Sequence, residues 1–164
     1  MSLRYFNAAG AVLGDSMGED HRPESHLIPN AIRGALGLQA FRLTSAAVDT
    51  SDGTTIRDYV HVLDLAEAHL RAVKVLEAGH PTDAINLGSG VGYSTREVID
   101  MVQRVTGLRF PLERGEPRPG EPPAKYASNE KAAEVLGWRP AHDLESIVRS
   151  TALWHDRHPA GYAD

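Results

Sequence analysis

Four side chains that could do acid–base or anion-binding chemistry fall within one short run of the sequence. They are Arg57, Asp58, His61 and Asp64. They are interspersed with apolar residues, so the run predicts a half-buried strand, and buried charge is costly unless it is paired or meets a ligand. The pattern therefore predicts either an internal ion pair of Arg57 with Asp58 or an anion-binding arginine, and the residues alone favour neither.

Other histidines are interpreted without a metal. His61 and His69 are expected to be packed or surface imidazoles. His155 and His158 stand three residues apart at a predicted helix end, a spacing that could hold a metal, but no third ligand is evident beside them. No metal site is predicted.

A glycine-rich turn, Gly88-x-Gly90-x-x-Tyr93, follows a predicted strand and imitates a dinucleotide-binding fingerprint. Tyr93 occupies the place of the third glycine, and the acidic residue that should follow a second strand is missing. The favoured interpretation is a tight turn that leads into a helix capped by Ser94 and Glu97.

Composition limits the class of protein. The chain has 164 residues, 41% of them hydrophobic, which suits one domain. Its formal net charge is -5, so nucleic acid and anionic membranes are not expected as partners. It has 0 cysteines, which fits a reducing compartment, and no apolar stretch long enough to span a membrane. A soluble cytoplasmic protein is expected.

The elements that must position these side chains follow from hydrophobic periodicity and turn signals. Strands are expected at 3–6, 41–44, 55–62 and 84–87, with an edge strand at 110–112; helices are expected at 27–36, 64–79, 95–107, 128–137 and 143–158. The strand at 3–6 is expected to be buried. Asp64, with Glu67 three residues on, is predicted to cap its helix, and Asp143 is predicted to cap the last one. The alternation of strands and helices predicts an α/β fold.

A series of motifs, in order over nearly the whole chain, carries a family resemblance. They are Arg4-Tyr-Phe-Asn7, Gly18-Glu-Asp20, His26-Leu-Ile-Pro29, the run from Asp52 to Val62 with Asp64-Leu-Ala66, Asn86-Leu-Gly-Ser-Gly90, Arg118-Pro-Gly-Glu121, Leu136-Gly-Trp138 and His158-Pro-x-Gly-Tyr162. Together they resemble the UDP-glucose 4-epimerases of the extended short-chain dehydrogenase/reductase superfamily. The resemblance covers the carboxyl half of such an enzyme.

The resemblance implies an α/β fold that is the C-terminal substrate-binding portion of such an enzyme and lacks most of the Rossmann domain. Residues 1–164 are expected to form one UDP-sugar-binding region, and the NAD-binding Rossmann domain to be absent from the chain. The family's catalytic core includes a Tyr-x-x-x-Lys pair, and none of the tyrosines here has a lysine four residues on. The chain alone is therefore expected to be catalytically inactive, with no catalytic residue assigned. NAD belongs to the complete enzyme and is not expected to bind this chain alone.

The resemblance also implies which residues meet the diphosphate. Arg57 and Arg118 would be its cations, which suits the planar fork of donors that a guanidinium offers. His26 and Leu27 would lie on the diphosphate side. Asn7 would contact the substrate near the sugar and diphosphate.

Further roles follow from the same resemblance. Glu121 stands where the family usually has Asp and would accept hydrogen bonds from the ribose hydroxyls. Thr44 falls where an aromatic residue usually packs on uracil. Tyr5 and Phe6 would lie beside the nicotinamide.

Other functions stay open at this point. The chain could be a non-catalytic module that binds phosphate or nucleotide through residues 88–92 or Arg57, a self-associating fragment, or half of a related nucleotide-sugar dehydratase or epimerase. In the absence of the Rossmann domain that would cover them, the otherwise buried strand at 3–6 and the helix after Asp64 are expected to expose apolar surface. Such patches favour association, so a homo-oligomer is expected.

Overall fold

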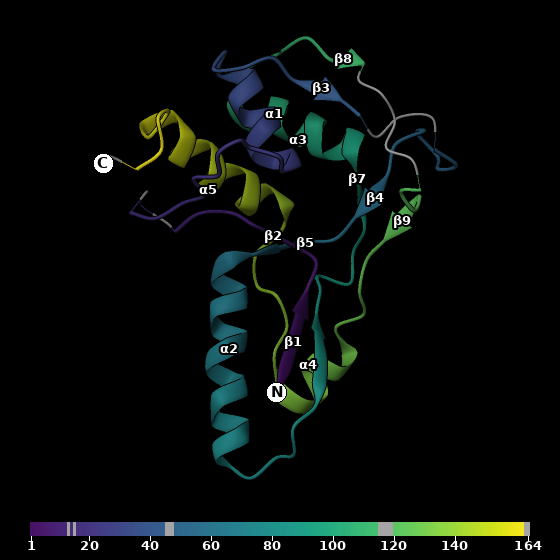
Figure 1. Ribbon diagram of the computed structural model, residues 1–164, viewed down its shortest axis with the longest axis vertical. Helices are drawn as coiled ribbons and strands as arrows, with labels where there is room; N and C mark the ends of the chain where they lie inside the picture. Colours follow the sequence, from purple (N-terminus) through teal and green to yellow (C-terminus); the bar gives the residue numbers. More distant parts are fainter. Residues whose placement is uncertain (13, 15, 45–47, 115–119, 163–164) are drawn as a thin grey trace.

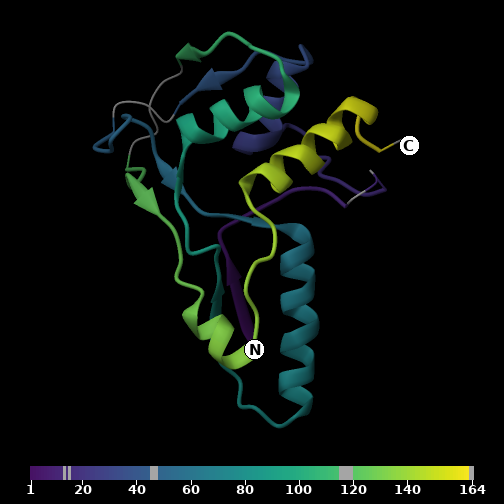
Figure 2. The same cartoon turned by 180° about the vertical axis from the view of Figure 1, so that it is seen from behind.

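A short parallel strand pair joins two groups of elements (Figure 1). The computed structural model describes residues 1–12, 14, 16–44, 48–114 and 120–162. In the central pair, β2 (Asn7–Ala9) lies beside β5 (Tyr59–His61), with Asn7 opposite Tyr59. In Figure 1 one group of helices lies above this pair and a strand and helix group lies below it, and the view from behind shows the same division (Figure 2).

The upper group is built from helices α1 (Leu27–Ala35), α3 (Thr95–Thr106) and α5 (Leu144–Arg157), which pack against one another. Each was predicted from its apolar period, and each turns that face inward. They share one hydrophobic cluster that includes Ile28, Ile32, Val98, Val102, Ile147 and Val148. This packing fixes the amino end of α1, which matters for the site.

Short strands border the upper group. Here β3 (Arg42–Leu43) pairs in parallel with β8 (Glu113–Arg114). Next to them, β4 (Ile56–Arg57) lies between β7 (Tyr93–Ser94), which is antiparallel to it, and β9 (Ala124–Lys125), which is parallel. The pairing of β4 with both neighbours holds Arg57 in a fixed position.

The lower group has its own core. β1 (Ser2–Tyr5) pairs in parallel with β6 (Ala84–Leu87), and the helices α2 (Val62–Glu77) and α4 (Glu130–Leu136) belong to the same group. Its buried cluster includes Val60, Leu65, Ile85, Leu87 and Trp138. The mixed architecture confirms the predicted α/β class.

Two predicted helix caps are confirmed. The Ser94 hydroxyl accepts a hydrogen bond from the Glu97 amide at 3.1 Å, and the Glu97 carboxylate accepts one from the Ser94 amide at 2.7 Å. At the start of α5, the Asp143 carboxylate accepts from the Ser146 amide at 2.8 Å. Both caps satisfy amides that a helix leaves unpaired at its first turn.

The predicted cap at Asp64 is wrong. α2 begins two residues earlier, and the His61 ring accepts the hydrogen bond from the Leu63 amide at 3.1 Å. Asp64 is buried instead, where its carboxylate accepts from the His142 amide at 3.1 Å and contacts the His142 ring at 2.8 Å. A long-range partner therefore outweighs the local capping pattern.

Two strand predictions also need correction. Of β1, expected to be buried, only Leu3 is even partly buried. The core of this group is filled by Ile85 and Leu87 of the neighbouring β6, and Leu3 only packs against it. The edge strand expected at 110–112 lies later, at β8. Phe110 is buried against Phe41, with ring centroids 5.4 Å apart, so this residue serves the core.

The surface shows the apolar exposure that was expected on α2. Leu70 is 61% exposed and Val73 53% exposed. Tyr5 on β1 is exposed as well, and its ring meets His69 of α2 edge-on at 6.1 Å. Of the helices in the described ranges, none combines the length and apolar character that a membrane crossing requires.

Candidate functional site

A cavity of about 680 Å³ opens where β2, the amino end of α1 and β4 come together. This volume suits a small organic ligand. The lining side chains come from within 5–9, 24–30, 40–44 and 55–59, with Thr95 and Glu121 added. Segments that are far apart in the sequence therefore converge on one space.

Most residues that were predicted to bind substrate or cofactor line this cavity. They are Tyr5, Phe6, Asn7, His26, Leu27, Thr44, Arg57 and Glu121. Arg118 lies outside the described residues. The gathering of the others is a property of the fold, because they sit on different strands, loops and a helix.

Arg57 is held at the cavity wall by three acceptors. One of its terminal nitrogens donates to the Glu121 carboxylate at 2.8 Å, and the other to the carbonyls of Ile56 at 2.7 Å and Pro122 at 3.0 Å. Its side chain is 15% exposed and that of Glu121 is 22% exposed. The guanidinium is thus oriented and largely shielded from water before any ligand arrives.

The alternative ion pair of Arg57 with Asp58 is wrong. Asp58 is fully buried, and its carboxylate accepts hydrogen bonds from the Ser89 amide at 2.9 Å, the Ser89 hydroxyl at 2.6 Å and the Ala127 amide at 3.0 Å. Successive residues of a strand point to opposite faces, so Arg57 and Asp58 point apart. Asp58 ties together the loops behind the cavity.

Asn7 and the start of α1 also line the cavity. The Asn7 side-chain amide donates to the Asp58 carbonyl at 2.7 Å, which fixes β2 against the strand run. His26 is the N-cap residue of α1, and residues 26–30 line the cavity. The amino end of a helix carries partial positive charge, which favours an anion, and the Glu24 carboxylate lies at the same end of α1.

Several lining residues were not predicted. Thr55 and Tyr59 flank Arg57 at a spacing of two along an extended run, and this alternation alone would have placed them on its face. Burial raises the pKa of the Tyr59 phenol well above its ordinary range, so its hydroxyl stays neutral. Glu24 was also missed, although it lies two residues before His26.

The glycine-rich turn after β6 lies away from this cavity. The Ser89 amide is used by Asp58, and the Val91 amide donates to the Ser89 hydroxyl at 3.2 Å. The turn leads through β7 into the capped α3, as predicted. The Ser89 and Val91 amides are used in hydrogen bonds within the protein, which argues against the alternative of a phosphate site at 88–92.

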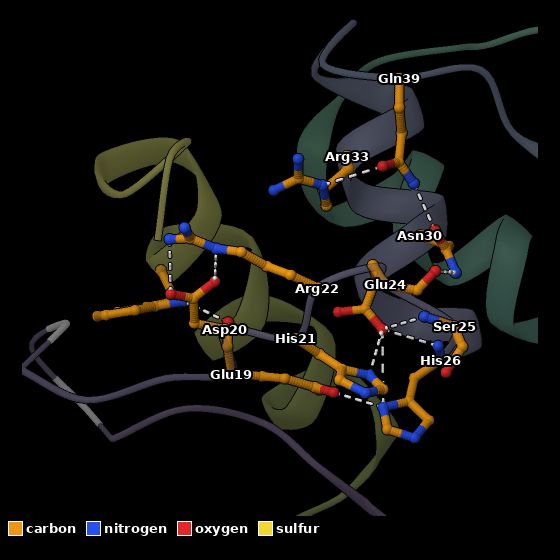
Figure 3. A network of polar contacts seen from close by, with 11 residues as sticks. Glu19, Asp20, His21, Arg22, Glu24, Ser25, His26, Asn30, Arg33 and Gln39 are labelled. Carbon is orange, nitrogen blue, oxygen red and sulfur yellow. Dashed lines mark hydrogen bonds and ion pairs between the residues drawn. The ribbon is translucent and has the colours of Figure 1, made fainter. Parts of the chain in front are cut away.

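No metal site was predicted from the sequence, and among the described residues the group of histidines and carboxylates that could hold a metal ion does not include His155 or His158. His155 is buried, and His158 stacks on Trp154 with ring centroids 4.1 Å apart. The group consists of Glu19, His21, Glu24 and His26, whose ligand atoms lie within 4.8 Å of one another (Figure 3). Two of its members, Glu24 and His26, also line the cavity.

Comparison with known proteins supports the motif-based resemblance. Residues 1–88 match the family model described as the NAD dependent epimerase/dehydratase family. The chain is 43% identical over 166 residues to the UDP-glucose 4-epimerase of Lacticaseibacillus casei, an alignment that covers 100% of this chain and 50% of the relative.

Solved structures agree with this comparison. A crystal structure of a UDP-glucose 4-epimerase superposes with a TM-score of 0.93 at 43% identity, covering 99% of this chain and 50% of that one. The UDP-glucose 4-epimerase from Bifidobacterium longum in complex with NAD+ and UDP gives a TM-score of 0.89 at 34% identity, covering 98% and 48%. The chain therefore spans about half the length of the relatives it matches.

Proposed function

The chain belongs to the NAD-dependent epimerase/dehydratase family, and from this membership we propose that its cavity binds the uridine diphosphate part of a UDP-sugar in a UDP-glucose 4-epimerase. The observation that carries the proposal is the oriented Arg57 guanidinium in the wall of a 680 Å³ cavity that the amino end of α1 also lines. Both features favour a diphosphate.

The remaining lining residues take complementary roles in this proposal. Glu121 accepts hydrogen bonds from the ribose hydroxyls, and Asn7 contacts the substrate between sugar and diphosphate. His26 and Leu27 lie on the diphosphate side, and Thr44 lies near the uracil. Arg118, which lies outside the described residues, would add a second cation.

The chain's part in the reaction is to hold the nucleotide while the sugar rotates and presents its other face. Epimerisation at the sugar C4 requires the sugar to turn about its link to UDP, so the binding energy must come from the diphosphate and uridine rather than from the sugar. A rigid guanidinium in the cavity wall meets that need, because its donors are oriented in advance.

NAD would accept the hydride from the sugar C4 and return it. The chain fits only one end of this cofactor: Tyr5 and Phe6 offer aromatic rings at the cavity for the nicotinamide. For the pyrophosphate, the glycine-rich turn at 88–92 does not serve, since Asp58 holds the Ser89 amide. We therefore propose that the chain alone does not retain NAD.

The same proposal holds that this chain alone is inactive. The proton of the sugar 4-hydroxyl would go to a tyrosinate supported by a lysine four residues on, and the tyrosines of this sequence lack that partner. The activity belongs to the complete enzyme, and the contribution of this chain is the nucleotide site.

Calorimetric titration of the 164-residue chain at low salt tests the proposal. We expect UDP to bind, uridine to bind much more weakly because it lacks the diphosphate, and NAD not to bind. Equal affinity for UDP and uridine would contradict the role of Arg57. Absence of UDP binding would contradict a nucleotide site that this chain forms by itself.

A further inference from the structure

The segment before α1 carries four side chains of the types that bind transition metals, within eight residues. The pattern is Glu19-x-His21-x-x-Glu24-x-His26, and the fold gathers all four side chains (Figure 3). We propose that these residues form a divalent transition-metal site, with zinc as the expected ion. The inference goes beyond the proposed function and does not rest on it.

The ligand atoms already stand close to a coordinating arrangement. The Nδ1 atoms of His21 and His26 each lie 3.7 Å from the same Glu24 oxygen, and His26 Nδ1 also contacts the Glu19 carboxylate. Ligands at about 2.0 to 2.1 Å from a tetrahedral zinc are about 3.4 Å apart. Small side-chain rotations therefore suffice to bring all four onto one ion.

Charge favours a cation at this point. With neutral imidazoles the four groups carry two negative charges, and carboxylates that share a site repel each other. A divalent ion balances that charge and uses all four ligands together. The alternative, histidines protonated and paired with the carboxylates, would contribute little because His21 and His26 are about half exposed.

The segment is held in place by contacts outside the group. Glu24 is 5% exposed, and its carboxylate accepts hydrogen bonds from the amides of Ser25 and His26 at 2.7 Å each. Both bonds go to Oε1, the oxygen nearest the two histidines, so the other carboxylate oxygen, Oε2, is the one that would coordinate the metal. On the other side, the Trp154 indole donates to the Glu19 carbonyl at 2.9 Å.

Asp20 adds a second anchor between the ligands. Its carboxylate accepts two hydrogen bonds from Arg22, at 3.1 and 3.0 Å, and one from the Tyr162 amide at 3.2 Å. The backbone that carries Glu19 and His21 is thus tied to the region after α5. Supporting contacts of this kind hold metal ligands in the geometry that coordination requires.

The ligand set also selects the ion. Two imidazole nitrogens and two carboxylate oxygens suit zinc and its neighbours in the first transition row, whereas magnesium and calcium prefer oxygen alone. Because Glu24 and His26 line the cavity, the ion would sit in the cavity wall.

The test is calorimetric titration of zinc chloride into the metal-free, untagged 164-residue chain, with millimolar magnesium present. We expect one zinc per chain. Cobalt(II) at the same site should give the intense visible absorption of a four-coordinate ion. Weak, multi-site binding, or cobalt spectra of a six-coordinate aquo-like ion, would overturn the proposal.

Matched variants locate the site. His21→Ala and Glu19→Gln each remove one ligand from a partly exposed position that lies outside the cavity lining, and each should weaken zinc binding at least tenfold. His80→Ala removes a histidine beyond the carboxyl end of α2 and should leave the affinity unchanged. Circular dichroism confirms that each variant is folded. Equal zinc affinity in all three variants and the parent chain would overturn the assignment.

Discussion

Arg57 owes its position to acceptors that belong to its own surroundings. Two backbone carbonyls and the Glu121 carboxylate hold the guanidinium, so a diphosphate meets donors whose direction is already set. Glu121 also offsets the positive charge of Arg57. The pair explains how a largely buried arginine is tolerated.

Replacing Arg57 by alanine should weaken UDP binding by about 2 to 4 kcal/mol, because charge-assisted hydrogen bonds to the diphosphate are lost. The measurement is UDP calorimetry on the 164-residue chain. Arg149→Ala, an exposed arginine on α5 paired with Glu145, is the matched control and should bind UDP like the parent. Unchanged UDP affinity in Arg57→Ala would show that the diphosphate lies elsewhere.

His155 makes stability depend on pH. Burial lowers its pKa, nearby Arg33 lowers it further, and Glu24 and Asp20 act in the opposite direction. Since the folded-state pKa lies below the unfolded value of about 6.5, the stability is complete above that pH, and it is lost as the pH falls towards the folded-state pKa. Urea unfolding between pH 7.5 and pH 5 should therefore show a falling free energy of unfolding.

His155→Leu should make that pH dependence shallower. It should also leave the chain about as stable at pH 7.5, because neither ring nitrogen has a hydrogen-bond partner within the described ranges. His80→Ala should keep the parental slope. If His155→Leu and the parent lost stability in parallel on acidification, other groups would be responsible.

Single residues could be predicted better than their partners. The sequence singled out Arg57 and Glu121 through family motifs, yet it offered Asp58 as the partner of Arg57, since a neighbour in sequence is the simplest choice. The fold brings Glu121 to Arg57 from a distant loop, and no local pattern reports such a contact. Glu19, His21 and Glu24 were missed as site residues, because carboxylates and histidines outside helices and strands follow no hydrophobic period, whereas His26 was predicted through a family motif.

At the scale of elements, the helices are where sequence and structure agree most closely. α1, α3 and α5 each have an apolar stripe that faces their shared core, and α3 and α5 also have side-chain caps. These signals are local and repeat along the chain, so they can be recognised without knowledge of the tertiary fold. Strands of two or three residues, such as β4 and β5, depend on distant partners. The sequence predicted these two only as a single strand, 55–62.

Removing the cap of α3 should cost about 1 kcal/mol of unfolding free energy, within the range measured for N-cap serines. Ser94→Ala deletes the acceptor for the Glu97 amide and the donor to the Asp52 carboxylate. Urea denaturation measures the loss. The exposed Ser128→Ala, which removes a weaker contact to the Glu130 amide at 3.2 Å, should cost less. An equal cost for both would argue against the capping box.

At the scale of the whole molecule, an apolar face stands exposed. Leu70 and Val73 lie three residues apart, on one side of α2, and Tyr5 of β1 adds to the same region through its contact with His69. An apolar patch of this kind favours association. We expect the chain to form a homodimer or a larger assembly through it.

Light scattering on the Leu70→Glu/Val73→Glu double variant tests the association surface. The parent should be larger than a monomer, and the variant should shift towards the monomer because charge is placed on the contact face. Leu38→Glu, at an exposed leucine just after α1, should leave the parental size unchanged. A strictly monomeric parent chain would contradict the expectation.

The broad architecture could be predicted, and the strand order could not. Alternating strands and helices indicated α/β, and the motifs indicated the family. The division into two cores on either side of β2 and β5 depends on which strands pair, and periodicity does not report pairing. Asp64 shows the same limit: its bond to His142 crosses from α2 to a loop far along the chain.

The strand pairing has a consequence for how quickly the chain reaches this fold. β1 pairs with β6, so Ser2 must find Ala84, and β3 pairs with β8, so Arg42 must find Glu113. Such distant contacts slow folding, because loop closure costs entropy before the contacts repay it, and mixed α/β chains fold at rates between those of helical bundles and all-β proteins. β1 can pair with β6 only after residues 84–87 have been synthesised.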